Sequence, residues 1–168
     1  MTIQRMNQLR LRLDRTGART ALVRRADAPS RPPETVTLAP GVSASMGLDG
    51  RTAPLLVSAE APSGRTIREY DGNDARAAAD CATQLVAERD PRAVWLCGRG
   101  QLRSWWGRGV ADMLERRLAA AARRADARLV VWTSESEPSD EPNVANEATA
   151  PNEDDVAVEG GYDVVLDP

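Results

Sequence analysis

The sequence predicts a mixed α/β fold in which N-terminal antiparallel strands and hairpins precede an α-β-α-β half with a buried parallel pair of strands. Three observations predict it. Apolar and polar residues alternate at several places in the first 60 residues, as in strands with one buried face. Two later stretches carry apolar residues at helical spacing. A short, almost wholly apolar run comes before the second of these stretches and another comes after it, as expected for strands buried on both faces.

The chain has 168 residues, a length that suits one domain or one domain plus a tail. Charge divides it in two. All 22 basic residues are arginine, and residues 134–168 hold 11 of the 25 acidic residues and no arginine. The body is therefore +8 and the tail −11. We expect one domain over residues 1–133, strand-rich to residue 60 and alternating between helix and strand from 67 to 133. We expect a disordered acidic tail over 134–168, because it cannot bury enough apolar surface to offset chain entropy.

The N-terminal part begins with a leucine row. Leu9, Leu11 and Leu13 alternate with arginines, a period of two that predicts a strand with one apolar face. A turn at residues 16–18 contains a glycine, and residues 20–25 return as a second strand. The two strands together predict a hairpin.

Three further strands are predicted before residue 61. Residues 35–38 form a short strand. Residues 42–48 and 51–60 flank Asp49-Gly50, a strong hairpin turn because glycine accepts positive φ. The run Leu55, Leu56 and Val57 makes the second arm the best core strand of this half.

The second half alternates helices and strands. Residues 75–89 form a helix that Asp74 caps and Asp90-Pro91 ends. Residues 93–97 are a buried strand, residues 110–124 a second helix and residues 127–133 a second buried strand. Short connections of this kind imply parallel pairing through a right-handed crossover.

Composition excludes several chemistries. The chain has no histidine, so it has no Ser-His-Asp or Cys-His machinery, and it has no lysine for Schiff bases or a Walker phosphate loop. Cys81 and Cys97 fit no metal or disulfide pattern and are expected to be buried thiols. No apolar stretch is long enough to span a membrane. We therefore expect a cytoplasmic protein that leans away from catalysis, without cofactor or metal. Arginine without lysine suggests a GC-rich genome, and the acidic balance would suit a halophile's high-salt cytoplasm.

The strongest candidate site is the segment 98–109, which follows a buried strand and opens a helix. Ligands in open α/β sheets lie at such places, and a helix start supplies free N–H donors. Three arginines add forked donors for phosphate or carboxylate, and two tryptophans offer a stacking or anchoring face. The predicted anion- or partner-binding residues are Gly98, Arg99, Gly100, Arg103, Trp105, Trp106 and Arg108.

Alternatives to a ligand pocket stay open for this segment. A GxGxxG motif would need glycine where Arg103 stands. The segment also fits a surface loop whose tryptophans cap the core while its arginines are solvated. A third interpretation is a protein-partner surface, because tryptophan and arginine are enriched in interface hot spots.

A secondary basic face is predicted on the N-terminal hairpin, with Arg10, Arg12 and Arg24 as its main members. It would track nucleic-acid phosphates, or else it is the solvated outer face of a sheet. Carboxylates between residues 60 and 74 offer thin support for acid–base or metal chemistry, because a turn and a helix cap explain Asp71 and Asp74 better.

The end of the tail breaks its polar pattern. Tyr162, Val164 and Leu166 alternate with other residues and predict a short edge strand or a segment that docks on a partner. The rest of the tail either keeps the chain soluble or folds back on the basic body. The sequence thus favours a small, non-enzymatic protein-interaction module, with an arginine-based nucleic-acid or nucleotide binder as the alternative.

Overall fold

A computed structural model describes residue 9 and residues 11–24, 34–41, 54–61, 64–133 and 162–166. The strands are β1 (Thr20–Arg24), β2 (Thr35–Pro40), β3 (Leu55–Ala61), β4 (Gly64–Tyr70), β5 (Ala93–Leu96), β6 (Arg128–Thr133) and β7 (Val164–Leu166). The helices are α2 (Ala75–Arg89), α3 (Arg99–Trp106) and α4 (Arg108–Arg124), and a 3-10 turn, η2 (Gly72–Asp74), precedes α2. None of these helices is both long and apolar enough to cross a membrane.

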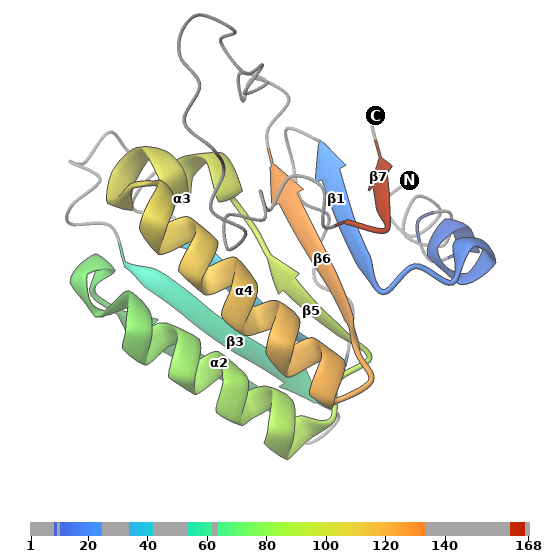
Figure 1. Ribbon diagram of the computed structural model, residues 1–168. Helices are drawn as coiled ribbons and strands as arrows, with labels where there is room; N and C mark the ends of the chain where they lie inside the picture. The colour runs from blue at the N-terminus through green and yellow to red at the C-terminus, as the bar shows by residue number, and fades with distance from the viewer. Residues whose placement is uncertain are drawn as a thin grey trace, which may run out of the picture.

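One seven-stranded sheet in the order β4-β3-β2-β5-β6-β1-β7 organises the chain (Figure 1). Strands β2, β3 and β4 form an antiparallel meander. Strands β2, β5, β6, β1 and β7 run parallel to one another. The predicted mixed α/β class is confirmed, and the predicted buried parallel pair is β5 and β6, with Val94 opposite Leu129.

Helices α2, α3 and α4 lie on the same side of the sheet (Figure 1). The apolar stripe of α2 and that of α4 meet the sheet, and the side chains of Leu38, Val57, Leu114 and Leu118 are fully buried between them. The chain has no phenylalanine, and α2 contributes four buried alanines to this core. Such small side chains let α2 approach the strands closely, so leucine and valine fill the space that remains.

A second, smaller apolar cluster covers the other face of the sheet at β5, β6 and β1. Trp95 and Trp132 lie side by side, with ring centroids 5.3 Å apart and planes tilted by 54°. Leu13 and Val130 pack with them and are buried. The two apolar clusters show why β5 and β6 are apolar on both faces, as their sequences predict.

The predicted N-terminal hairpin is wrong. Residues 11–16 are helical, and β1 pairs in parallel with β6 rather than with the preceding residues. Leu9 and Leu13 are four positions apart and share one face of a helix, whereas Leu11 is 54% exposed. The leucine row is therefore compatible both with the period of a strand and with the spacing of a helix. Packing of Leu13 against the tryptophan cluster selected the helix.

The second predicted hairpin, around Asp49-Gly50, has a different outcome. The predicted turn at Asp49-Gly50 lies outside the described residues. Strand β3 instead pairs with β2 on one side and with β4 on the other. Strand β4 was not predicted, because its exposed residues (Ile67 is 51% exposed) leave little apolar alternation in the sequence.

Candidate functional site

The predicted loop 98–109 is mostly helix. Gly98 adopts a φ of 68° and turns the chain sharply from β5 into α3, where a Cβ atom would lie 3.0 Å from Pro40. Gly107 has a φ of 85° and separates α3 from α4. These two glycines permit left-handed backbone at both ends of α3, so the glycine-rich composition marks the ends of a helix rather than a loop.

Arg99, the first residue of α3, points into the protein. Its Nε donates to Glu115 Oε2 of α4 at 3.1 Å, and the two side chains are only 4% and 3% exposed. Arg99 Nη2 and Glu115 Oε1 have no hydrogen-bond partner among the described residues. Burial raises the pKa of Glu115, against the opposing charges of Arg99 and Arg103. The ion pair is therefore deeply desolvated and only partly hydrogen-bonded.

Arg103, one turn along α3, faces a second carboxylate. Its Nη2 lies 3.5 Å from Asp112 Oδ1 of α4, and both side chains are mostly buried. The two arginines and two carboxylates together have no net formal charge. The expectation that Arg99 and Arg103 present their guanidinium groups to an anion is therefore corrected, because Arg99 is buried and α4 places a carboxylate against each guanidinium.

Trp105 and Trp106 end α3 in an edge-to-face pair, with centroids 5.7 Å apart and planes at 86°. Trp106 packs against the main core, and both rings are half-buried. Arg108, beyond Gly107, is exposed, and Gly100 is half-buried within α3. The tryptophans therefore sit at the rim of the core, as both the capping and the partner-surface interpretations expect.

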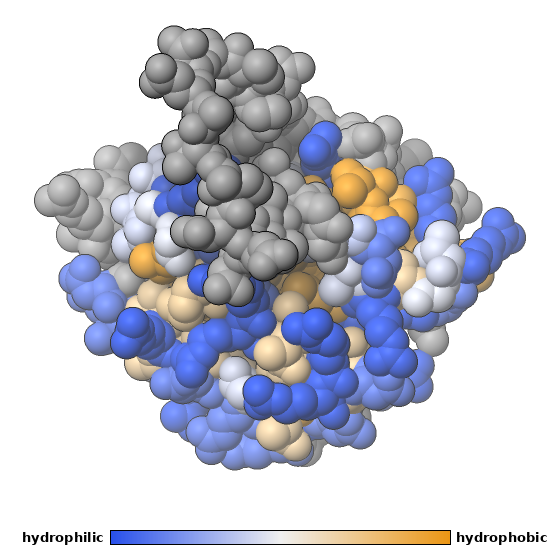
Figure 2. All heavy atoms as spheres, viewed as in Figure 1, coloured by the Kyte–Doolittle hydropathy of each residue, from blue (hydrophilic) through white to orange (hydrophobic). Residues whose placement is uncertain are grey.

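The C-terminal segment 162–166 forms the second notable arrangement. Strand β7 adds in parallel to β1, with Val164 opposite Ala21 and Leu166 opposite Val23. Figure 1 shows β7 at the end of the sheet, and Figure 2 shows hydrophobic residues gathered in that area. The predicted edge strand is therefore present. Its middle residue, Val165, is 44% exposed.

Asp163 fixes this segment to the start of β1. Its Oδ2 accepts the backbone N–H of Arg19 at 2.7 Å and that of Thr20 at 3.0 Å. The backbone N–H of Asp163 in turn donates to the carbonyl and hydroxyl oxygens of Thr20 at 3.1 Å and 3.0 Å. The donors from Arg19 and Thr20 hold the pKa of Asp163 below its usual range. We call this set of four hydrogen bonds the Asp163 clamp.

Tyr162 connects the C-terminal segment 162–166 with the start of α3. It packs against the main core, whereas Val164 and Leu166 pack against the tryptophan cluster on the opposite face of the sheet. The Arg99 guanidinium lies 5.9 Å from the centroid of the Tyr162 ring, within range of a cation–π interaction. The segment therefore holds the sheet edge from both sides.

The predicted secondary basic face is not formed as expected. Arg12 is exposed on the helical residues 11–16, Arg24 is exposed at the end of β1, and Arg10 lies outside the described residues. Because residues 11–16 are not a strand, Arg12 does not share a sheet face with Arg24. Several other arginines pair with carboxylates at the surface, as in Arg19–Asp126, Arg92–Glu34, Arg117–Asp80 and Arg128–Asp14.

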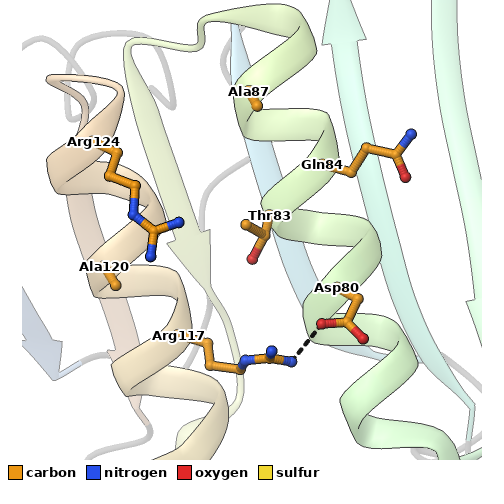
Figure 3. A pocket seen from close by; sticks show the side chains of 7 residues that line it. All are labelled: Asp80, Thr83, Gln84, Ala87, Arg117, Ala120 and Arg124. Atoms are coloured by element: carbon orange, nitrogen blue, oxygen red, sulfur yellow. Dashed lines mark hydrogen bonds and ion pairs between the residues drawn. The ribbon is translucent and has the colours of Figure 1, made fainter.

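Sequence reasoning missed a shallow groove of about 330 Å³ between α2 and α4 (Figure 3). Arg117 of α4 reaches across it to Asp80 of α2, with 2.5 Å between Nη1 and Oδ1. No sequence signal could have revealed it, because the groove forms only where two helices that are separate in the sequence pack side by side. Its lining is Asp80, Thr83, Gln84, Ala87, Arg117, Ala120 and Arg124.

Of the carboxylates considered for acid–base chemistry, Asp71 has a structural role, whereas Asp74 stands at the N-cap position of α2 but its side chain makes no capping hydrogen bond, contrary to the prediction. Asp71 Oδ1 accepts the N–H of Asn73 at 3.1 Å and caps η2, as the turn interpretation predicts. Within the described ranges no three His, Cys, Asp or Glu side chains gather as a metal site would require. Neither Cys81 nor Cys97 forms a disulfide, and both are half-buried rather than buried as expected.

Comparison with known proteins adds no relative: no protein-family model, curated protein or solved structure matches the chain.

Proposed function

We propose that the chain is a non-enzymatic protein-interaction module of the cytoplasm, and that its contact surface is the end of α3 around Trp105, Trp106 and Arg108. The observation that carries the choice of a protein partner over a polyanion is the pairing of Arg99 with Glu115 and Arg103 with Asp112. A phosphate would have to compete with carboxylates already seated on both guanidinium groups.

The tryptophan pair supports a protein partner. Trp106 packs on the main core and Trp105 stands edge-to-face against it, so the Trp105 ring is held with little freedom to lose on binding. Rigid aromatic side chains that keep part of their surface accessible are common anchors of protein interfaces. Exposed Ser104 and Arg108 lie beside it in the chain and provide a polar rim.

The test uses three chains as bait in a cell extract and compares the proteins that each recovers. The chains are the wild type, Trp105→Ala and a matched control, Arg116→Ala, at an exposed position of α4. We expect a specific set of proteins to be lost with Trp105→Ala and kept with the control. The free energy of unfolding of Trp105→Ala should lie within about 1 kcal/mol of the wild-type value, because the Trp105 ring lies outside the main core. Equal recovery with all three chains would exclude Trp105 as the anchor.

Salt dependence separates the two classes of partner. Binding that neutralises phosphates weakens steeply as salt rises, with a log–log slope near the number of phosphates contacted. We expect the wild-type chain to bind a random-sequence DNA duplex negligibly, and partner recovery to change little with salt. Tight, steeply salt-dependent binding of the duplex would favour the polyanion class instead.

A further inference from the structure

The edge of β1 holds residues 162–166 through strand pairing and through a side-chain contact. Any strand edge offers main-chain hydrogen bonds to an added strand. This edge also selects one side chain, because the N–H groups of Arg19 and Thr20 both donate to a single carboxylate oxygen of Asp163. Two charge-assisted bonds to one oxygen select a carboxylate over a neutral residue at that position.

The positions beside the carboxylate are selected by burial. Val164 and Leu166 pack against the tryptophan cluster, whereas Val165 is 44% exposed and faces away. Tyr162 packs on the opposite face of the sheet, beneath the Arg99 guanidinium. The β1 edge therefore favours a five-residue segment with the pattern aromatic, aspartate, aliphatic, any residue, aliphatic.

In the part of the tail that the structure describes, the β1 edge contacts these five residues, and 28 residues separate Tyr162 from Thr133 at the end of β6. A segment from another molecule with the same pattern would make the same contacts. We propose that the β1 edge is a binding site for an extended segment of a partner protein with this pattern, and that residues 162–166 occupy it until such a segment displaces them. This site is separate from Trp105, and its test does not depend on the function proposed above.

Competition sets the affinity scale. Because the resident segment belongs to the same chain, its effective concentration at its own site is on the order of 1 mM. A free segment added to the wild-type chain must displace that resident, so its apparent binding is weak. Weakening the resident alone should expose the intrinsic affinity of the edge.

The experiment uses the full chain and a labelled peptide of sequence GYDVVLDP, which copies residues 161–168. Asp163→Ala in the chain removes two charge-assisted hydrogen bonds from residues 162–166 and leaves the backbone of β1 unchanged. We expect this chain to bind the peptide about tenfold more tightly than wild type, by fluorescence anisotropy. Failure of the folded Asp163→Ala chain to bind the peptide would overturn the proposal.

Peptide variants test the pattern itself. Alanine at the aspartate position, or aspartate at the position of Val164, should abolish binding, whereas threonine at the position of Val165 should leave it unchanged. Equal binding of all variants would show nonspecific association and overturn the proposal.

A measurement on the wild-type chain covers the case in which Asp163→Ala does not fold. The amide hydrogens of Arg19 and Thr20 should exchange through local release of the segment, much faster than those of Leu129 to Val131 in central β6. Exchange of both sets only by global unfolding would show that the segment never leaves, and would overturn the proposal.

Discussion

The α3–α4 corner and the β1–β7 edge each engage a carboxylate, and they do so in opposite surroundings. Glu115 is 3% exposed and meets one guanidinium, whereas Asp163 lies at the surface and accepts two backbone N–H groups. The pKa of Glu115 is raised, chiefly by burial, and that of Asp163 is lowered, chiefly by its backbone donors. The comparison teaches that an opposite charge in a dry site does not fully offset lost hydration, whereas aligned donors at the surface stabilise a carboxylate.

The largest expected effect breaks the buried pair. Glu115→Ala leaves the Arg99 guanidinium buried without its partner, which should lower the free energy of unfolding by about 3–5 kcal/mol. Denaturant unfolding measures this change.

A double variant sharpens the same comparison. Arg99→Met with Glu115→Leu replaces the pair by apolar groups of similar size and should recover most of the loss. A cost below about 1 kcal/mol for Glu115→Ala would contradict the deep desolvation of the pair.

Acidification should act on the two carboxylates with opposite signs. The folded pKa of Glu115 is raised from its ordinary 4.5, so its contribution to stability is present below that value and is lost as pH rises through the raised pKa. The folded pKa of Asp163 is lowered from 3.8, so its contribution is present above 3.8 and is lost as pH falls through the lowered pKa.

The readout is the chemical shift of the Arg19 and Thr20 amides, which should follow the titration of Asp163 below 3.8 while the core signals stay native. Loss of the native core signals at a higher pH than these amide shifts would contradict this order of events.

The smallest effect is expected at the exposed pair across the α2–α4 groove. Arg117 and Asp80 are 45% and 65% exposed, so Asp80→Ala should change the free energy of unfolding by less than about 0.5 kcal/mol. Thermal unfolding at low and high salt checks it. A loss comparable to that of Glu115→Ala would show that exposure does not separate these two ion pairs.

Much of the second half could be predicted because its signals are local. The helix predicted over residues 75–89 matches α2 residue for residue, since its apolar stripe and its Asp90-Pro91 end lie within one stretch of chain. The apolar runs that became β5 and β6 needed no partner to be recognised as strands. The leucine row at residues 9–13 failed because alternation and helical spacing coincide over so few residues.

The candidate site depended on contacts that no local pattern shows. Arg99 and Glu115 are 16 positions apart and meet only because α3 turns at Gly107 and α4 runs back across the sheet. Likewise, Asp163 meets the N–H groups of Arg19 and Thr20 across more than 140 positions of sequence. The alternation at the end of the tail predicted a strand, but it did not identify β1 as its neighbour.

By itself the sequence determined the mixed α/β class, the helix–strand alternation after residue 67 and the lack of histidine and lysine chemistry, because periodicity and composition are properties of the chain alone. Tertiary structure alone decided which arginines are neutralised and which strand the C-terminal segment joins. The physical reason is that charge pairing and edge pairing depend on groups brought together by the packing of distant elements, and burial then sets the strength and sign of their interaction.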